Sequence, residues 1–211
     1  MMVTDRRRVA RAAGASEIDA LVRAVARGVN AGATMIQVRE RALDDSELLD
    51  LTARLVRQSA PSGARVVVND RVDVAIAAAA AGVHLPASGA PPERVRAVAP
   101  PGFLIGRSVH SEAEARAAEQ TGACDYLVFG SVYPTASKPP GHEPAGIDAL
   151  ARVCRMVRLP VLAIGGIDAR RAREVARAGA AGVAAIGLFV GHDDDVLNAA
   201  VREIAHAFAS E

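Results

Sequence analysis

Short apolar segments alternate with helical segments along the chain, and this alternation constrains the fold more than any other feature. Each apolar run is rich in Val and Ile, and an Ala/Arg/Glu segment of helical periodicity follows it. Such alternation predicts βαβ units and a parallel sheet. The expected strands are Met2–Thr4, Met35–Val38, Arg65–Val68, Gly82–Leu85, Phe103–Gly106, Tyr126–Phe129, Val161–Ile164 and Gly182–Ile186. The expected helices lie near 16–31, 45–60, 71–80, 91–98, 111–121, 146–157, 168–178 and 193–209.

Eight strand–helix pairs within 211 residues predict an α/β fold, a (βα)8 TIM barrel, as a single domain over residues 1–211. The alternative is an open doubly wound sheet, but no glycine-rich nucleotide-binding turn follows the first expected strand. Helix-capping residues support the same pattern, because they mark where the helices begin and end. Those expected are Ser16, Asp44 and Ser111 at helix starts and Gly32, Gly122 and Gly179 at helix ends.

Composition narrows the class of partner. The net charge is +1, so no basic excess indicates nucleic acid or an anionic membrane. The longest apolar run, 74–83, is far shorter than the ~20 residues that a membrane helix needs. Cys124 and Cys154 are isolated and form neither a metal-binding spacing nor a disulfide framework. We therefore expect a cytoplasmic protein with no nucleic-acid or membrane partner, and the sequence leaves a homo-oligomer open.

Polar residues gather at the carboxyl ends of the expected strands and just after them, where barrel enzymes place their active sites. Each has an ordinary structural explanation alone, but together they predict a site. They are Gln37, Arg39, Glu40, Arg41, Asn69, Asp70, His84, Arg107, Ser108, His110, Gly165, Gly166, Asp168 and Gly187. After the sixth strand, the aperiodic loop 129–142 carries hydroxyl groups and Lys138. Long loops of this kind inside compact domains are usually functional or disordered, and this composition suits an anionic, phosphorylated small molecule.

Two groups of residues point to more specific chemistry. Gly165, Gly166 and Gly187 follow strands seven and eight, which is the usual phosphate site of such barrels, and glycine lets backbone N–H groups approach phosphate oxygens. Their alternative role is in tight strand–helix turns. Asp70 lies among cations and predicts a hard divalent ion such as Mg2+, which takes few protein carboxylates. The alternative for Asp70 is an ion pair with Arg71 or another neighbour.

The motifs as a set resemble the thiamine phosphate synthase/TenI superfamily of thiamin biosynthesis, from about residue 2 to residue 190. The superfamily is a (βα)8 barrel, and its synthase branch joins hydroxymethylpyrimidine diphosphate to thiazole phosphate carboxylate with Mg2+, losing pyrophosphate and CO2. The matching segments are Gln37-Val-Arg39-Glu-Arg41, Val68-Asn69-Asp70-Arg71-Val72-Asp73, Gly82-Val83-His84-Leu85, Gly106-Arg-Ser108-Val-His110, Asp125-Tyr126 through Phe129-Gly130, Pro134-Thr135-Ala-Ser137-Lys138 and Ala163-Ile-Gly165-Gly166-Ile.

The resemblance implies a role for each matched residue, toward small phosphorylated heterocyclic substrates. It implies that Asp70 binds Mg2+. The residues implied at the pyrimidine and its diphosphate are Gln37, Arg39, Arg41, Asn69, Ser108 and Lys138, of which Arg39, Lys138 and Ser108 are assigned to catalysis. Those implied at the thiazole phosphate are Thr135, Ser137, Gly166, Ile186 and Gly187. The implied mechanism is dissociative: the diphosphate ionises, and the thiazole nitrogen captures the pyrimidine carbocation.

The chain departs from both branches of the superfamily. The synthase branch has a second Mg2+ carboxylate where this chain has Gly89. The TenI thiazole tautomerase branch has a catalytic histidine where this chain has Ser131, and a hydroxyl is a poorer proton shuttle than imidazole. The synthase reaction is the leading expectation because Asp70, Arg39, Arg41 and Lys138 suit diphosphate chemistry. Thiazole tautomerisation, with His110 or His142 as the shuttle, and non-catalytic binding of thiazole or thiamin phosphates remain as alternatives.

Overall fold

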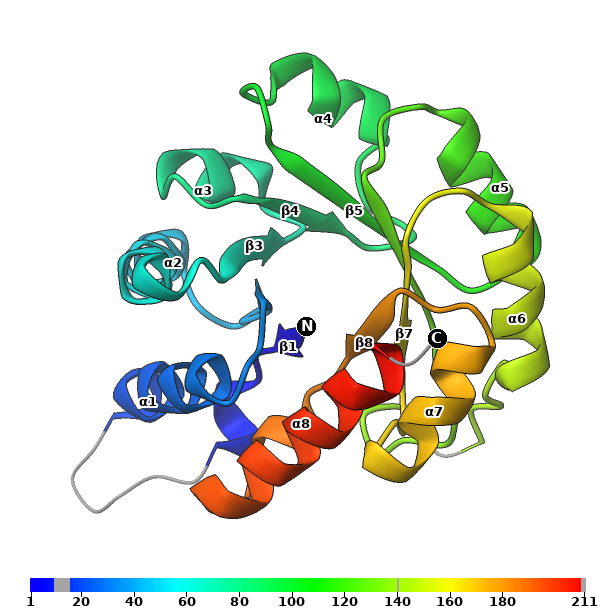
Figure 1. Cartoon of the computed structure of the whole chain (residues 1–211). Coiled ribbons are helices and arrows are strands. Elements are labelled where there is room, and N and C mark those ends of the chain that lie inside the picture. The colour runs from blue at the N-terminus through cyan, green and yellow to red at the C-terminus, as the bar shows by residue number, and fades with distance from the viewer. Residues whose placement is uncertain (10–15, 140, 210–211) are drawn as a thin grey trace. The chain divides into compact units, whose positions relative to one another are not determined.

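The computed structural model describes residues 1–9, 16–139 and 141–209, and these divide into two compact units (Figure 1). The first unit holds the described residues of Met1–His84 together with Pro100–Phe103 and Ile186–Arg202. The second unit holds Leu85–Ala99, Leu104–Ala185 and the described chain from Glu203 onward.

The first unit pairs four consecutive strands in parallel, each with the next along the chain. The strands are β1 (Met2–Val3), β2 (Met35–Val38), β3 (Arg65–Asn69) and β4 (Gly82–Leu85), whose last residue belongs to the second unit. The helical elements are η1 (Arg6–Arg8), α1 (Glu17–Asn30), α2 (Asp45–Ser59), η2 (Ala60–Ser62), α3 (Val72–Ala77), η3 (Gly187–Phe189) and the first part of α8 (Asp194–Ala209).

The second unit repeats this arrangement with four more strands, in which each of β6, β7 and β8 pairs in parallel with the strand before it. The strands are β5 (Leu104–Val109), β6 (Tyr126–Gly130), β7 (Val161–Ile164) and β8 (Gly182–Ala184). The helices are α4 (Pro92–Val98), α5 (Glu112–Gln120), α6 (Ile147–Met156) and α7 (Ala169–Arg177). Ile204 and Phe208, near the end of α8, pack against the core of this unit.

The order of elements confirms the predicted fold class, a (βα)8 barrel in which strands and helices alternate. The ends of β1, β3 and β6 differ from expectation by one residue, and the bounds of β5 and β8 differ by more. Strand β5 runs on to Val109 because Arg107 and Ser108 continue the ladder with β6, opposite Leu127 and Val128. Strand β8 ends at Ala184, so Ile186 lies in the loop that follows. The single domain over the whole chain stays a prediction.

The expected capping residues start their helices. The side chains of Ser16, Asp44 and Ser111 accept hydrogen bonds from backbone N–H groups at the third position of α1, α2 and α5. At Asp44 the bond is reciprocal, because the Glu47 carboxylate accepts the N–H of Asp44, which makes a capping box. The predicted helix-ending glycines all have positive φ: Gly32 at 114°, Gly122 at 64° and Gly179 at 92°.

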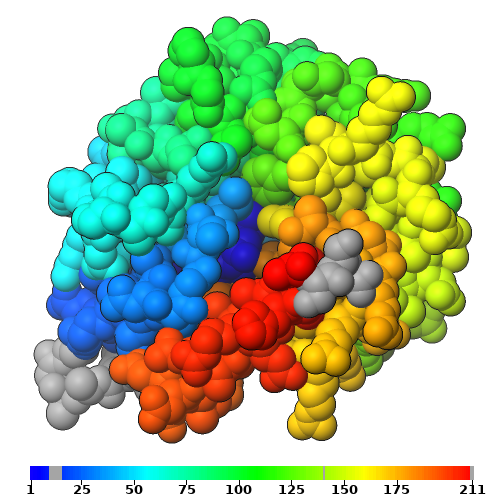
Figure 2. All heavy atoms as spheres, in the orientation of Figure 1, coloured from blue at the N-terminus to red at the C-terminus, as the bar shows by residue number. Residues whose placement is uncertain are grey.

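Mainly aliphatic side chains fill the interior of each unit. In the first unit, helices α1 and α2 press side chains onto the strands, and their outer faces form surface (Figure 2, blue and cyan). Fully buried residues there include Leu21, Val25, Ile36, Leu51 and Leu55. In the second unit the core includes Leu127, Phe129, Leu150, Val153 and Ala163. Each of these Val, Leu, Ile and Phe side chains contributes about 1.5–3 kcal/mol by leaving water. Across the described residues, no helix combines the length and apolarity that spanning a membrane requires.

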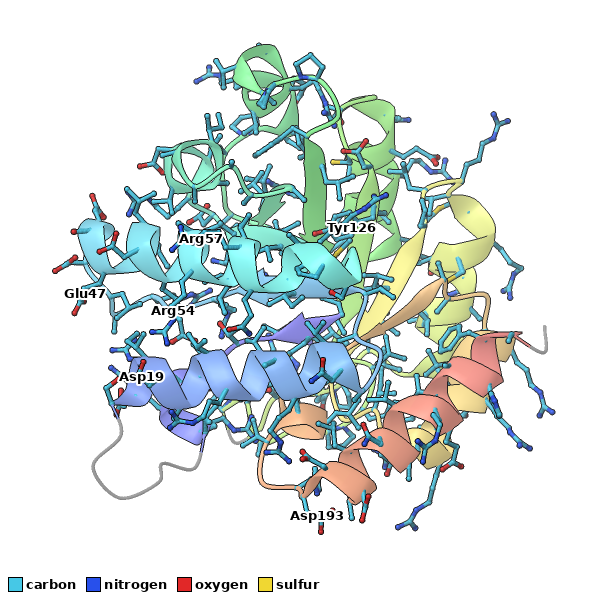
Figure 3. The ribbon with its side chains drawn as sticks, turned by 60° about the vertical axis from the view of Figure 1, so that its left-hand side comes forward. Asp19, Glu47, Arg54, Arg57, Tyr126 and Asp193 are labelled. Atoms are coloured by element: carbon cyan, nitrogen blue, oxygen red, sulfur yellow. The ribbon has the colours of Figure 1, made fainter. Side chains whose placement is uncertain are left out.

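A close approach across strands β5 and β6 generates a prediction about stability. Tyr126 (labelled in Figure 3) lies directly opposite Gly106, and a Cβ at Gly106 would fall 2.1 Å from the ring atom Cζ. We expect Gly106→Ala to lower the free energy of unfolding by about 1–3 kcal/mol through overpacking, measured by urea denaturation. Gly182→Ala is the matched control, because its Cβ would meet only the flexible Cδ2 of Leu162, at 3.1 Å. Equal losses in the two variants would contradict this explanation.

Candidate active site

Two amide side chains are joined at the carboxyl ends of strands β2 and β3. Nε2 of Gln37 donates a hydrogen bond of 3.1 Å to Oδ1 of Asn69. Gln37 is buried although it is polar, and this bond satisfies one of its donors. Because each amide orients the other, the first unit presents a fixed pair of hydrogen-bonding groups at this edge of its sheet. The structure thus brings together two of the residues expected at the pyrimidine.

Asp70 follows Asn69 directly and has a left-handed backbone conformation, with φ at 67°. Aspartate adopts this region more readily than most residues, and such conformations cluster at functional sites. The backbone N–H of Asp70 donates to the carbonyl oxygen of His84 on β4, while its side chain is exposed. Within the described part of the chain, nothing forms an ion pair or hydrogen bond with the Asp70 carboxylate.

Arg71, the residue that could have paired with Asp70, binds other carboxylates instead. Its guanidinium donates to both oxygens of Asp73, at 2.9 and 2.6 Å, and also pairs with Asp45 at the start of α2. The hydrogen bonds that Arg71 donates to Asp73 and Asp45 raise the pKa of Arg71 above its ordinary value. The structure therefore rejects the simplest alternative reading of Asp70, an ion pair with its neighbour.

Arg39 and Arg41 line a cavity of about 210 Å³ in the first unit, beyond the ends of β1 and β2. The cavity is bounded by Asp5, Arg6, Arg7, Arg39, Glu40, Arg41 and Ala42. Arg39 is half-buried, and its backbone N–H donates to Oγ1 of Thr4 at 2.9 Å. Burial, followed by the nearby charge of Arg41, lowers the pKa of Arg39. Four guanidiniums against two carboxylates leave the cavity with an excess of positive charge.

Glu40 lies between these two arginines in sequence, yet its carboxylate is turned into the protein. It is buried and accepts both the backbone N–H and the guanidinium Nη1 of Arg6, at 3.1 and 3.4 Å. Burial raises the pKa of Glu40, whereas its hydrogen bonds with Thr4 and Arg6 act in the opposite direction. Glu40 therefore fastens the segment after β1 to the end of β2.

The predicted phosphate-binding residues Ile186 and Gly187 belong to the first unit and lie at the start of η3. The space beside Gly187 is open, and Arg8 borders it. A Cβ atom at this glycine would lie 3.7 Å from Nη2 of Arg8, and among the described residues no other side chain would be nearer. The structure thus places a guanidinium close to this backbone.

In the second unit, Ser108 lines a cavity of about 280 Å³ that also includes Ala87, Gly89 and Arg107. Ser108 lies inside β5 rather than after it. Arg107 does not extend into solvent, because its guanidinium donates to the carbonyl oxygens of Ala87 and Ala90, at 2.6 and 2.9 Å. It therefore fixes the turn around Gly89, the position at which the synthase branch is expected to carry its second acid.

Ser131 and His142 form a hydrogen bond that the sequence pattern does not reveal. Oγ of Ser131 lies 2.8 Å from Nε2 of His142, and Ser131 is buried at the end of β6. Nδ1 of His110 lies 2.6 Å from the carbonyl oxygen of Gly130, the preceding residue. The loop also folds back on itself, since Ala145 donates its backbone N–H to the carbonyl of Ser131. The His142 imidazole thus contacts Ser131, the position where the tautomerase branch has its histidine, and the His110 imidazole contacts the residue before it.

Gly165 and Gly166 pack tightly against the loop after β6. A Cβ at Gly165 would fall 2.5 Å from Cβ of Ser131, and one at Gly166 would fall 2.4 Å from the carbonyl oxygen of Pro134. Both glycines have positive φ, 102° and 64°. Close contact between the two loops therefore requires glycine here, in addition to any role of these residues in binding phosphate.

Thr135, Ser137 and Lys138 occupy one turn of this loop. The hydroxyls of Thr135 and Ser137 lie 3.0 Å apart, and the backbone N–H of Lys138 donates to the carbonyl of Thr135. Ser137 and Lys138 are exposed, and Thr135 is partly buried. The turn presents two hydroxyls and one ammonium group on a single short segment, as the sequence predicts.

Tyr133 anchors this loop to α7, and the sequence analysis missed it. Its hydroxyl donates to Oε2 of Glu174 at 2.6 Å, and the Arg171 guanidinium lies 4.4 Å from the ring centroid. Arg171 also donates to the carbonyl oxygen of Gly166. Burial and the bond to Glu174 raise the pKa of Tyr133 above its ordinary value. In the sequence, Tyr133 is visible only as a tyrosine inside a polar loop. That pattern does not reveal its partner Glu174, which lies on a helix far along the chain.

Comparison with known proteins gives a consistent result across the chain. The family model described as thiamine monophosphate synthase matches residues 1–189. The thiamine-phosphate synthase of Methanocella arvoryzae is 42% identical, over 84% of this chain and 82% of that protein. The thiamine-phosphate synthase of Roseiflexus sp. (strain RS-1) is 39% identical, over 99% of this chain and 84% of that protein. The solved structure of thiamine phosphate pyrophosphorylase from Pyrococcus furiosus matches with a TM-score of 0.82 and 34% identity, covering 99% of this chain and 94% of that one.

The two carboxylates that hold Arg6 differ in burial, which generates a prediction about stability. Oε2 of Glu40 lies 3.4 Å from Arg6 and Oε2 of Glu17 lies 3.0 Å from it, but their side chains are 4% and 36% exposed. We expect Glu40→Gln to lower the free energy of unfolding by about 1–3 kcal/mol, because the buried carboxylate becomes a neutral amide with a single acceptor oxygen beside Arg6. Glu17→Gln is the matched control and should cost under ~1 kcal/mol, as exposed ion pairs do. Chemical denaturation measures both, and a larger loss in Glu17→Gln would refute the ranking.

Proposed function

The chain belongs to the thiamine monophosphate synthase family, and we propose that it couples hydroxymethylpyrimidine diphosphate to thiazole phosphate or its carboxylate. In this reaction the bond between the pyrimidine methylene carbon and the diphosphate oxygen breaks, and pyrophosphate leaves with the electron pair. The thiazole nitrogen then forms a bond to the same carbon. With the carboxylated thiazole, CO2 is lost as well.

One observation carries this proposal: an unpaired carboxylate, Asp70, is exposed at the end of β3. Arg71 binds Asp45 and Asp73 and leaves the Asp70 carboxylate without an ion-pair partner among the described residues. An exposed acid next to the amide pair Gln37–Asn69 suits a metal–diphosphate complex. A phosphate monoester alone would be repelled by this carboxylate.

The donor set fits Mg2+ bound together with substrate. Mg2+ is commonly held by one or two carboxylates, with phosphate oxygens and water as its other ligands. Asp70 supplies one carboxylate, and Gly89 supplies none. Within the described ranges, no three acidic, histidine or cysteine side chains group closely enough to form a metal cage. Mg2+ held by Asp70 would add positive charge at the departing pyrophosphate.

The protein's own residues bind, orient and neutralise the reactants. Arg39 and Arg41 offer guanidiniums to the diphosphate in the cavity that they line, and such fixed charges stabilise a leaving anion. The mutually fixed amides of Gln37 and Asn69 orient the pyrimidine ring. In the second unit, Ser108 and Lys138 are assigned to the same half-reaction on the family pattern. Positioning both reactants in this way provides much of the rate enhancement.

The thiazole phosphate is assigned to hydroxyl groups and to backbone. Thr135 and Ser137 present adjacent hydroxyls from one turn, and Gly166 follows β7 with its backbone held against that loop. Ile186 and Gly187 offer backbone N–H groups without a bulky side chain at Gly187. These assignments rest on the family pattern, and the open space beside Gly187 supports them.

A direct assay tests the proposed function. The purified chain is incubated with hydroxymethylpyrimidine diphosphate, thiazole phosphate and Mg2+, and thiamin phosphate and pyrophosphate are quantified. We expect both products in equal amounts, with no product when the metal is chelated. The absence of thiamin phosphate above a control without enzyme would reject the proposal.

Asp70 gives the sharpest variant within this assay. We expect Asp70→Asn to lower the rate by about 100-fold or more, which corresponds to about 2.7 kcal/mol of transition-state stabilisation. Asp73→Asn is the matched control, because this carboxylate lies three residues away and is neutralised by Arg71. It should keep activity within a few-fold of the original protein. Similar losses in both variants would show that Asp70 has no special role.

The Ser131–His142 hydrogen bond favours a second candidate function, thiazole tautomerisation. An imidazole 2.8 Å from the hydroxyl could replace the histidine of the tautomerase branch as the proton-transfer group. His142→Ala should then abolish isomerisation of the thiazole carboxylate phosphate, followed by NMR in deuterated water. His110→Ala is the comparison, since the His110 ring contacts the backbone carbonyl of Gly130 and not the Ser131 hydroxyl. Isomerisation that is unchanged in His142→Ala would dismiss this function for His142.

A further inference from the structure

Three consecutive arginines in η1, directly after β1, have no assigned role in the proposed function. A 3-10 turn has about three residues per turn, so neighbouring side chains point in different directions. The structure shows this divergence clearly. Arg6 binds two carboxylates, Arg7 lines the cavity with Arg39 and Arg41, and Arg8 extends toward Gly187.

Arg6 fixes the turn in place. Its guanidinium pairs with Glu17 at 3.0 Å and Glu40 at 3.4 Å, and its backbone N–H donates to Glu40 at 3.1 Å. Its side chain is only 13% exposed. The turn is therefore tied both to α1 and to the end of β2, and the position of the next residue, Arg7, follows from this anchor.

Arg7 shares the cavity but has no partner of its own. Unlike Arg6, it forms no ion pair with any residue that the structure describes, and the same is true of Arg39 and Arg41. Three guanidiniums without carboxylate partners around about 210 Å³ repel one another. The lowered pKa of Arg39, caused by burial and then by Arg41, is consistent with that repulsion. A bound polyanion would relieve it.

The dimensions and charge of the cavity select the kind of anion. Its volume corresponds to about seven water molecules at their liquid volume. Guanidiniums bind phosphate oxygens through paired, charge-assisted hydrogen bonds. Arg6 and Glu40 neutralise each other. The guanidiniums that remain in the cavity, those of Arg7, Arg39 and Arg41, face one acid, Asp5. This excess of positive charge favours an anion with more than one charge.

We propose that Arg7 binds the diphosphate of the pyrimidine substrate and the pyrophosphate product, as a third guanidinium beside Arg39 and Arg41. This assignment rests on the proposed function, because it takes its diphosphate from that reaction. Arg6 and Glu40 act as positioning residues that hold Arg7 at the cavity. The turn after β1 thus becomes part of the leaving-group site.

Binding of inorganic pyrophosphate, with Mg2+ present, tests the proposal by isothermal titration calorimetry on the full chain. Arg7→Gln should weaken binding about tenfold, since one charged hydrogen-bonding partner is lost. Arg8→Gln is the matched control, because it removes the same charge from the same turn outside the cavity. Arg54→Gln is the remote control: Arg54 pairs with Asp19 at 2.8 Å, and the two side chains extend toward each other from α2 and α1 (Figure 3). Both controls should stay within about twofold.

The outcomes separate this assignment from the proposed function. The assignment is overturned if Arg7→Gln binds pyrophosphate as tightly as the two controls do. It is also overturned if Arg7→Gln and Arg8→Gln weaken pyrophosphate binding equally. If the original chain forms thiamin phosphate in either case, the proposed function stands without Arg7. If no product forms but pyrophosphate binding depends on Arg7, the proposed function fails and the anion site stands. An unchanged melting temperature in Arg7→Gln shows that any loss of binding is not due to unfolding.

Discussion

Parallel hydrogen bonding between consecutive strands is the constraint on which each unit depends. Because all strands of a parallel sheet run the same way, their carboxyl ends share one edge, and polar residues that follow them meet there. In the first unit, the ladder places Gln37 opposite Val3 on one side and Val67 on the other. Arg39 then donates its backbone N–H to Thr4, and Gln37 reaches Asn69. The placement of these four residues therefore follows from strand register, since each lies at or just beyond the end of a strand.

Charge is divided at this edge between residues that build the structure and residues that remain available. Arg71 is taken by Asp45 and Asp73, and Arg6 is taken by Glu17 and Glu40. The carboxylates of Asp70 and Asp5 remain, together with the guanidiniums of Arg7, Arg39 and Arg41, and none of them has an ion-pair partner among the described residues. An unpaired charge gives up the stability that a partner would provide, and such groups are common at sites where a ligand provides the partner.

The sequence predicts the elements well because their signals are local. Helix starts at Ser16, Asp44 and Ser111 follow from a side chain and an N–H three residues away. The predicted end of β5 was wrong because pairing with β6 continues through polar residues that carry no strand signal. The polar rim was also predicted, but which arginine binds which acid was not. That choice depends on distances between segments far apart in sequence, as does the bond between Ser131 and His142. The sequence shows which charges are present, and tertiary structure decides which of them are neutralised.

In the proposed reaction, Asp70 and the unpaired guanidiniums of Arg7, Arg39 and Arg41 act on one substrate, and this has a thermodynamic consequence. Mg2+ alone would meet one protein carboxylate and nearby positive charge, so its binding would be weak. Diphosphate alone would meet the guanidiniums but also the negative charge of Asp70. Together they complement each other, because the metal neutralises Asp70 and the diphosphate oxygens complete the coordination of the metal. By linkage, each must raise the affinity for the other by the same factor. The proposed site would therefore be selective for the metal–diphosphate complex over either component.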